Sequence, residues 1–321
     1  MLRKIDNSYQ LIEFIQISIN FLYRHPLAKY KLLKRFGGYF NYQKILKEKM
    51  KMQNHSEMLK PIQSYSDGLN IYFLTGKMYL YQTLFCICSL KASTKLKFKF
   101  TLVDDGSFDK ELINLIRIKL PDAEVVTTEM ININIDNILP ENEFPILRQK
   151  RKEYAHIKKL TDIHTIPGEW KLVLDSDMLF WNEPIEIIEW LKNPNMPLHM
   201  IDCEQSYGYT EKLMEELTGY KIPDLVNVGV MGFNSKSLNW RDLEDWTKIL
   251  EEKEGKTYYL EQALSAMLLS NKQTMALRQS NYKVNPTKEE VFNNEGVLHH
   301  YVDLSKEWYF KNAWKKLNYF D

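Results

Sequence analysis

The chain has 321 residues, which is enough for one large domain or two ordinary ones. Hydrophobic residues make up 44% of it and aromatic residues 13%, and this much apolar surface excludes a disordered chain because it can build a core. Lys and Arg number 43 against 42 Asp and Glu, for a net charge of +1. The chain therefore lacks the overall basic field of a nucleic-acid-binding protein, and we expect no nucleic-acid partner.

The balanced total hides an uneven distribution of charge. Residues 1–60 hold 12 Lys and Arg but 4 Asp and Glu, a net charge of +8, whereas residues 61–321 carry −7. A break in pattern at Ser66-Asp67-Gly68 separates the two regions. We therefore predict a basic helical extension over residues 1–68 and a main domain over residues 69–321.

The basic extension is predicted to be helical. Apolar residues recur at helical spacing over 11–23, a basic segment follows over 24–35, Gly37-Gly38 interrupts it, and a second helical stretch covers 42–58. One interpretation is a surface that contacts anionic lipid, which would make residues 1–60 a peripheral membrane contact. The alternative is a pair of solvated helices packed on the main domain through an apolar stripe.

The lack of a recognisable targeting segment and the pattern of cysteines predict a cytoplasmic location. No stretch reaches 18 apolar residues, and residues 11–23 lack the uninterrupted apolar centre of a signal peptide. The three cysteines are odd in number, and Cys86 and Cys88 lie in an apolar run, as expected of buried thiols in a reducing compartment. We expect a cytoplasmic protein, held at the inner face of the membrane if its extension binds lipid.

Strands and helices alternate through the main domain. Such alternation predicts an α/β fold, in which helices cover both faces of a mainly parallel sheet. We expect strands over 71–75, 98–103, 123–128, 171–174, 198–201 and 227–233, and helices over 79–90, 110–120, 146–165, 238–250 and 259–269.

Polar residues follow three of the predicted strands. They are Thr75-Gly76, Asp104-Asp105-Gly106 and Asp175-Ser176-Asp177. In open α/β sheets, ligands bind outside the carboxyl ends of the strands, so these residues are expected to line one binding edge.

The strongest chemical signal is WKLVLDSDMLFW, residues 170–181. An apolar strand delivers Asp175 and Asp177 two positions apart, so both side chains can reach one point. Two carboxylates that close repel each other unless a cation lies between them, and oxygen ligands suit Mg²⁺ or Mn²⁺. The alternative is a pair of solvated aspartates at a strand end, but apolar residues on both sides argue against a generic surface loop.

This segment resembles the D-x-D motif of the GT-A fold glycosyltransferases. Segments around it resemble, in the same order, other motifs of the family 8-like retaining transferases: DDGS at 104–107, NVGVMGFN at 227–234, YLEQA at 259–263 and LHHYV at 298–302. The likeness covers roughly residues 70–302. The late motif departs from the family pattern, because residues 303–308 stand where that family has a glycine followed by K-P-W.

The resemblance implies a Rossmann-like GT-A fold with a mixed, mainly parallel central sheet. It also implies transfer of a sugar from a nucleotide-diphosphate donor, UDP-linked by default, to a glycan, glycolipid or other hydroxyl acceptor with retention of configuration. Asp175, Asp177 and His300 would hold Mn²⁺ or Mg²⁺, and an imidazole ligand favours Mn²⁺. His299 is the alternative ligand; on a strand the two histidines point to opposite faces, so only one should reach the metal.

The same resemblance suggests three further groups of contacts. Arg148 and Lys159 share a face of the predicted helix 146–165 and would reach the donor together with Asn227 and Gly229. The predicted nucleotide contacts are Thr75, Gly76, Tyr79, Asp104, Asp105 and Ser176. The predicted catalytic contacts to sugar or acceptor are Asp202, Glu261 and Gln262.

Two other functions fit the same fold class. A sugar nucleotidyltransferase would need a glycine-rich basic loop after the first strand, whereas GKMYLYQ, residues 76–82, supplies one lysine. A non-catalytic protein that binds nucleotide sugars would not need both the aspartate pair and the late histidine. Neither a P-loop nor a G-x-G-x-x-G fingerprint occurs in the sequence.

Overall fold

A mixed sheet of seven strands forms the centre of the computed structural model, which describes residues 25–317. The strand order is β3-β2-β1-β4-β7-β6-β8; the first four strands run parallel, β7 runs antiparallel to β4 and to β6, and β8 is parallel to β6. The predicted α/β class and mainly parallel sheet are confirmed. The strands are β1 (Leu69–Thr75), β2 (Phe98–Asp104), β3 (Glu124–Val126), β4 (Trp170–Leu174), β6 (Leu198–Ile201), β7 (Val226–Asn234) and β8 (Met275–Leu277).

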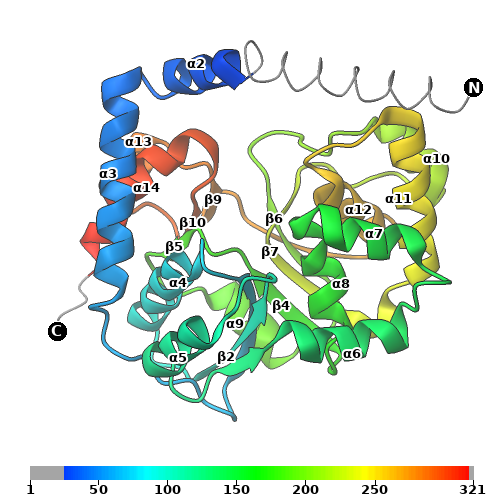
Figure 1. Ribbon diagram of the computed structural model, residues 1–321, viewed down its shortest axis with the longest axis horizontal. Coiled ribbons are helices and arrows are strands. Elements are labelled where there is room, and N and C mark those ends of the chain that lie inside the picture. The colour runs from blue at the N-terminus through cyan, green and yellow to red at the C-terminus, as the bar shows by residue number, and fades with distance from the viewer. Residues whose placement is uncertain (1–24, 318–321) are drawn as a thin grey trace, which may run out of the picture.

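Helices cover both faces of this sheet (Figure 1). Successive residues of β1 enter two separate hydrophobic clusters, Ile71 and Phe73 in one and Tyr72 in the other, as the pleat of a strand requires. The helices are α4 (Leu80–Ser93), α5 (Lys110–Lys119), α6 (Thr128–Ile138), α7 (Pro145–Glu153), α8 (Lys158–Thr165), α9 (Ile185–Lys192), α10 (Glu211–Thr218), α11 (Trp240–Glu254), α12 (Leu260–Leu269), α13 (Lys288–Asn293) and α14 (Lys306–Lys311).

A second, three-stranded sheet joins the two most informative sequence motifs. Its order is β5 (Met178–Phe180), β10 (Leu298–His300), β9 (Tyr282–Val284). The apolar run after the aspartates forms β5 and pairs antiparallel with β10, so that His300 lies opposite Met178. This pairing places the late histidine motif beside the aspartate pair.

The predicted helix over 146–165 is wrong as a single element. The chain forms α7 and α8, which are separated by an extended residue, Tyr154 (φ −136°, ψ 97°), and a 3-10 turn, Ala155–Ile157. The Tyr154 hydroxyl donates to the carbonyl of Tyr258 at 2.5 Å. Because that partner is distant in sequence, local periodicity could not reveal the break.

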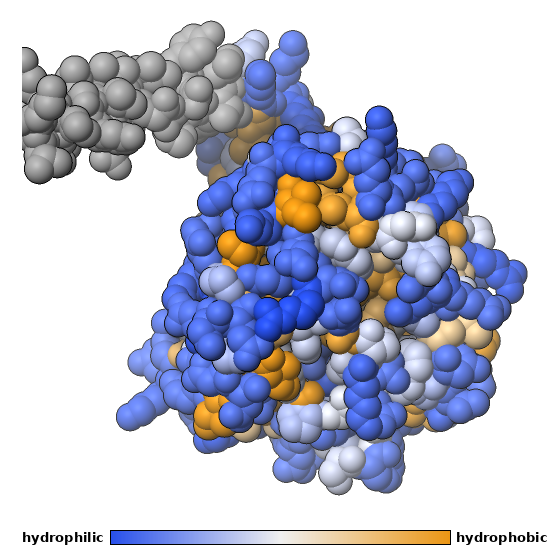
Figure 2. Space-filling model, turned by 90° about the vertical axis from the view of Figure 1, so that its right-hand side faces the viewer, coloured by the Kyte–Doolittle hydropathy of each residue, from blue (hydrophilic) through white to orange (hydrophobic). Residues whose placement is uncertain are grey.

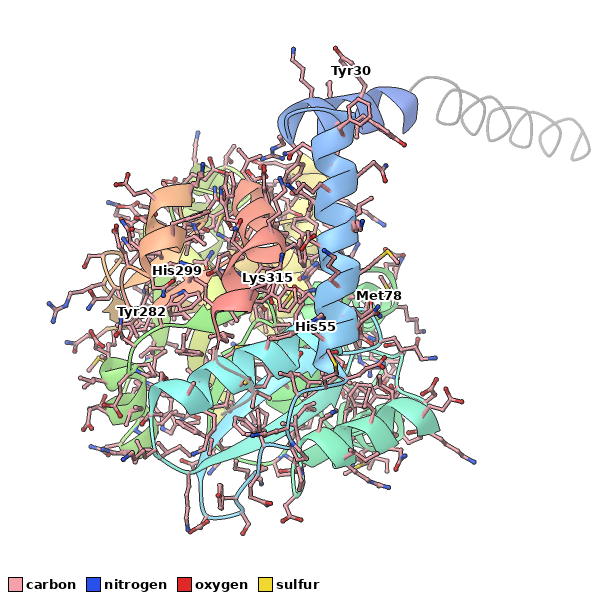
Figure 3. The ribbon with its side chains drawn as sticks, turned by 90° about the vertical axis from the view of Figure 1, so that its left-hand side faces the viewer. Tyr30, His55, Met78, Tyr282, His299 and Lys315 are labelled. Atoms are coloured by element: carbon pink, nitrogen blue, oxygen red, sulfur yellow. The ribbon has the colours of Figure 1, made fainter. Side chains whose placement is uncertain are left out.

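The amino-terminal region turns a sharp corner before it packs on the main domain. Helix α2 (His25–Arg35) is followed by Gly37 and Gly38, whose φ angles of 73° and 99° suit glycine, and α3 (Tyr39–Ser56) begins after them. Helix α3 buries Ile45 and Met52 in the same cluster as β1 and α4. Figure 3 shows α3 standing alongside α14 and the segment that bears Lys315.

Packing of α3 on the body agrees with the alternative of a packed helix for that part of the extension. The helix predicted over 11–23 lies outside the described residues. Within residues 25–317, no helix is both long and apolar enough to cross a membrane.

Candidate active site

A cavity of about 550 Å³ opens at the edge of the sheet where β4 ends and β7 begins. It lies where the polar strand ends predict a ligand site. Carboxylates, cationic side chains and tyrosines share its wall. Its lining includes Tyr79, Asp105, Lys159, Asp175, Ser176, Asp177, Asp202, Asn227, Tyr258, Glu261, Gln262, His300 and Lys306.

Asp175, Asp177 and His300 meet at one point of this cavity. Each offers one ligand atom, and the three atoms lie within 4.8 Å of one another. The Nε2 atom of His300 is 3.6 Å from Oδ2 of Asp175 and 3.4 Å from Oδ1 of Asp177. Two carboxylates and one imidazole form a donor set that fits Mn²⁺, and Mg²⁺ less well because of the nitrogen ligand.

A hydrogen bond orients the His300 ring toward the carboxylates. Its Nδ1 lies 3.2 Å from Oδ1 of Asn227, and a proton on Nδ1 makes this the donor and leaves the Nε2 lone pair facing the aspartates. His299, the alternative ligand, points to the other face, where its Nε2 contacts the carbonyl of Glu295 at 2.5 Å and its Nδ1 lies 3.2 Å from the Tyr301 hydroxyl. The strand geometry therefore excludes His299 from this cluster.

Two lysines balance the aspartates. The Nζ of Lys159 is 2.9 Å from Asp175 and 3.3 Å from Glu261, and the Nζ of Lys306 is 3.2 Å from Asp177. Burial alone would raise the pKa of Asp177, but Lys306 and His300 outweigh it and hold that pKa well below its usual range. Asp177 is therefore held as an anion beside Lys306.

The pKa of Glu261 is shifted in the opposite direction from that of Asp177. Burial raises its pKa to about 7, against the attraction of Lys159 and with support from the negative charge of Asp175. A carboxyl group of this kind changes charge near neutral pH, inside a cavity that holds polar groups of both signs.

A buried amide network supports the wall beside Glu261. One carboxylate oxygen of Asp202 accepts hydrogen bonds from Nδ2 of Asn227 at 2.9 Å and from Nε2 of Gln262 at 3.0 Å. Its other oxygen accepts from the backbone N–H of Cys203 at 2.8 Å. Asp202 thus lies at the predicted place, but its carboxylate is committed to positioning Asn227 and Gln262.

Two glycines allow close approach at the site without lining it. A Cβ atom on Gly229 would lie 2.5 Å from the ring of His300, and one on Gly76 would lie 2.1 Å from the Asp105 carboxylate. Gly229 therefore makes room for the imidazole, and Gly76 makes room for the acidic loop after β2. Both contribute space instead of a donor or acceptor side chain.

A chain of hydroxyl groups links the end of β1 to the aspartate turn. Oγ1 of Thr83 lies 2.8 Å from Oγ1 of Thr75 and 2.8 Å from Oγ of Ser176. Thr75 is fully buried behind the cavity, whereas Tyr79, Asp105 and Ser176 line it. Of the predicted nucleotide contacts, these last three have side chains in reach of a ligand.

Asp104 and Arg148, which are also predicted contacts, do not line this cavity. The Asp104 carboxylate is buried and accepts hydrogen bonds from the N–H groups of Gly106 and Phe108 and from Thr128. It organises the loop after β2 and the start of α6. Arg148 instead binds Asp136 at 2.7 Å, because the break at Tyr154 separates its helix face from that of Lys159.

Sequence reasoning did not assign a role to Lys306, which lies at the centre of the site. A signal for it was present, since Lys306 and Trp308 stand in the spacing of the family's K-P-W. Asp303 occupies the place of the family's glycine and takes φ 47°, the left-handed conformation that glycine favours.

Aromatic residues of the cavity were also missed. Tyr154, His156 and Tyr258 line it, and the His156 ring packs edge-on against Tyr258 with centroids 4.9 Å apart. They converge from the turn before α8 and the loop before α12. No local motif marks them, because only the fold brings the two segments together.

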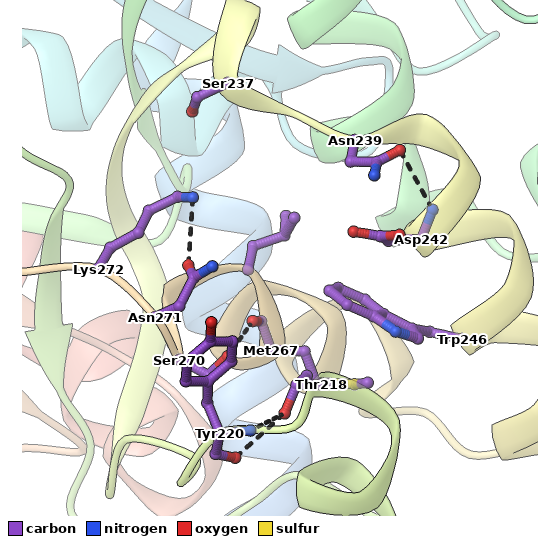
Figure 4. A pocket seen from close by; sticks show the side chains of 11 residues that line it. Thr218, Tyr220, Ser237, Asn239, Asp242, Trp246, Met267, Ser270, Asn271 and Lys272 are labelled. Atoms are coloured by element: carbon purple, nitrogen blue, oxygen red, sulfur yellow. Dashed lines mark hydrogen bonds between the residues drawn. The ribbon is translucent and has the colours of Figure 1, made fainter.

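A second, smaller cavity of about 290 Å³ lies among α10, α11 and α12 (Figure 4). Trp246, Tyr220, Asp242 and Lys272 are among the residues that line it. It shares no residue with the first cavity and contains none of the predicted site residues. The surrounding face of the molecule is mostly hydrophilic, with apolar side chains in small separate groups (Figure 2).

Comparison with known proteins gives structural likeness without close relatives in sequence. No family model matches the chain, and no curated protein matches its sequence. Mouse xyloside xylosyltransferase 1 in its apo form is similar in structure, with a TM-score of 0.50 and 15% identity over 75% of this chain and 98% of that chain.

Two further similar structures have TM-scores below 0.50. The galactosyltransferase LgtC, in complex with donor and acceptor sugar analogs, has a TM-score of 0.49 and 14% identity over 78% of this chain and 96% of that one. The glycosyltransferase GlyE of Streptococcus pneumoniae TIGR4 has a TM-score of 0.46 and 15% identity over 77% and 61%. The mixed, mainly parallel sheet with helices on both faces and the likeness to the mouse enzyme show that this chain has a GT-A fold.

Proposed function

We propose that this protein is a metal-dependent glycosyltransferase. It moves a sugar from a nucleotide-diphosphate donor, UDP-linked by default, to a hydroxyl group of a glycan, glycolipid or other acceptor, with retention of configuration. The observation that carries the proposal is the meeting of Asp175, Asp177 and His300 at the binding edge of a GT-A sheet. We further propose a cytoplasmic location, with contact between residues 1–60 and the membrane.

The donor diphosphate binds between the metal-binding cluster and the lysines. A bound Mn²⁺ or Mg²⁺ would neutralise negative charge on the departing nucleoside diphosphate. Lys306 donates a charge-assisted hydrogen bond to a phosphate oxygen from its place beside Asp177. Asp177 stays ionised, because Lys306 and His300 keep its negative charge favourable, and Lys159 forms an ion pair with Asp175.

The nucleoside lies toward the ends of β1 and β2 in this proposal. Tyr79, which is half exposed at the cavity rim, stacks on the base, and Asp105 accepts hydrogen bonds from the nucleoside. Ser176, between the two aspartates, is held by Thr83 and faces the same part of the cavity. Sequence and geometry support these assignments jointly.

The donor sugar lies against Glu261, Gln262 and Lys159. Glu261 accepts a hydrogen bond from a sugar hydroxyl when ionised, and the Gln262 carbonyl oxygen is an acceptor on the same wall. The acceptor oxygen forms the new bond to the anomeric carbon as the bond from that carbon to the phosphate oxygen breaks. The acceptor proton passes to the departing diphosphate, so no separate strong base is required.

An assay of donor turnover tests the proposal. The purified protein is incubated with a panel of nucleotide sugars and hydroxyl acceptors, with Mn²⁺ or with excess chelator, and released nucleoside diphosphate is measured. We expect turnover with at least one donor and its loss in chelator, because the diphosphate would lose its main counter-charge.

Asp177→Asn is the matched variant for this assay. It keeps the size of the side chain while removing one anionic ligand, and we expect turnover to fall about 100-fold or more. Asp245→Asn, at an exposed position on α11, is the control and should turn over at the parent rate. Undiminished turnover of Asp177→Asn, or in chelator, would contradict the metal role.

A further inference from the structure

The corner between α2 and α3 carries Phe40, which has the largest exposed fraction among the large hydrophobic side chains of the described residues, and three further exposed apolar side chains. Phe40 is 87% exposed, Tyr30 62% and Tyr39 55%, and Leu32 also lies open to solvent. Figure 3 shows Tyr30 at the far end of the molecule, beyond the helices that pack on the sheets. Four large apolar side chains on eleven consecutive residues are costly to expose to water, so they favour an interface.

Charge identifies the kind of surface that this corner fits. Positions 14–47 of the sequence contain no Asp or Glu but hold seven Lys and Arg residues. Lys31 and Lys34 are exposed among the apolar side chains of the corner. Aromatic side chains interleaved with lysines suit the interface of an anionic bilayer, where rings enter the headgroup region and ammonium groups meet lipid phosphates.

The same corner contacts the wall of the larger cavity. Arg35, the last residue of α2, lines the cavity and forms an ion pair with Asp303. Nδ2 of Asn41 donates to Oε1 of Glu307 at 2.9 Å. Asp303 and Glu307 flank Lys306, whose Nζ lies 3.2 Å from Asp177. A surface that binds the corner therefore lies next to the wall of the cavity that Arg35, Asp303 and Lys306 form.

We propose that the corner, residues 30–40, docks the protein on an anionic lipid surface and turns its cavity toward acceptors anchored there. The acceptor class is then a lipid-linked glycan or glycolipid. This assignment of the acceptor rests on the proposed glycosyltransferase function, whereas the docking itself does not. Arg35 and Asn41 connect the docked corner to Asp303 and to the start of α14, which carries Lys306.

Flotation with vesicles tests the docking directly and needs no activity. The full chain is mixed with vesicles of phosphatidylcholine alone or with about one third phosphatidylglycerol, at low and high salt. We expect binding to the anionic vesicles only, weakening as salt rises. The double variant Tyr39→Ser/Phe40→Ser should lose about tenfold or more of this binding, because both rings are exposed and leave the packed core untouched.

Ile133→Ser is the matched control. Ile133 is 63% exposed on α6, so its replacement removes exposed apolar surface far from the corner in sequence, and the variant's vesicle binding should equal that of the parent. Equal flotation of the double variant and the parent would overturn the proposal. A second result would also overturn the proposal. If the parent binds no vesicles but self-associates by light scattering, and the double variant loses this self-association, then the corner joins two copies of the chain.

Activity assays distinguish the docking proposal from the proposed glycosyltransferase function. The double variant should turn over a soluble donor and acceptor at the parent rate, yet transfer to a glycolipid in anionic vesicles at a rate reduced about tenfold. Equal loss with both acceptors would contradict a docking role. If no donor is turned over while vesicle binding depends on Tyr39 and Phe40, the glycosyltransferase function fails and the docking stands.

Discussion

The chemistry of the cavity depends on which of its ionisable side chains carry a positive charge and which a negative one. Asp175 and Asp177 face His300, Lys159 and Lys306 in a site that would otherwise concentrate negative charge. The local motif was sufficient to predict that Asp175 and Asp177 lie close together, because side chains two positions apart at the end of a strand can reach one point. The spacing of Lys306 and Trp308 offered a signal for Lys306, but the residues around them differ from the family motif and obscured it.

Glu261 provides a test by pH. Burial raises its pKa to about 7, so it gains a proton below neutral pH and is anionic above it. If its anion accepts a hydrogen bond from the donor, kcat/KM should rise through pH 7 and level off above about pH 8. Glu261→Gln should lose about 1.5–3 kcal/mol of transition-state binding, roughly a 10- to 150-fold drop in kcat/KM, and should lack this rise. A Gln variant with the parent's pH profile would assign the titration to another group.

At the scale of elements, the site lies at the ends of β4 and β7, and substitutions in each strand can be tested separately. Strand periodicity was enough to predict both strands, whereas β5 has three residues and was hidden in the aromatic run after the aspartates. The break between α7 and α8 depends on a contact between Tyr154 and the carbonyl of Tyr258. Contacts of that range explain why the placement of Arg148 could not be predicted from helical spacing.

Gly229 in β7 should be needed for metal binding. In Gly229→Ala, the new Cβ would lie 2.5 Å from the His300 ring, so we expect Mn²⁺ affinity to fall about tenfold or more. Gly232→Ala is the matched control in the same strand, because its Cβ would instead meet the ring of Trp190 at 2.6 Å. Both variants should lose about 1–3 kcal/mol of stability from overpacking. Calorimetric titration with Mn²⁺ should separate them, and equal affinities would contradict the role of Gly229.

Lys171 in β4 predicts a pH dependence of stability unrelated to catalysis. Its side chain is fully buried, with Nζ donating to the carbonyls of Ile166 and Gly168 and to Oγ of Ser235, and burial lowers its pKa to about 8. Above pH 8 the unfolded chain therefore holds this proton more tightly than the folded one. The Lys171 contribution to the free energy of unfolding should rise by at most about 1.4 kcal/mol per pH unit from about pH 8 towards the unfolded pKa.

Urea unfolding of the parent and Lys171→Met at pH 7.5, 8.5 and 9.5 measures this contribution. The difference in unfolding free energy between parent and variant should shift in favour of the parent as pH rises. A difference that stays constant over this range would show that Lys171 has an ordinary pKa in the folded state.

At the scale of the whole molecule, the net charge of +1 joins two regions of opposite character. The basic residues 1–60 contain α3, which packs on the sheet, and the corner that we propose meets lipid, while the body gathers carboxylates around the cavity. The order of the sequence motifs was enough to predict the GT-A fold and the grouping of Asp175, Asp177 and His300. The lining of the cavity by Arg35 and by Tyr258 depends on tertiary packing and could not be predicted from sequence.

Calorimetric titration of UDP into the protein, with and without Mn²⁺, tests the central claim most directly. The account predicts that UDP binds measurably with Mn²⁺ present, that affinity falls about 100-fold or more in chelator, and that Asp177→Asn lowers it to a similar extent even with Mn²⁺. UDP binding that is equally tight with Mn²⁺, with chelator and in Asp177→Asn would contradict a metal-held diphosphate at this edge of the sheet.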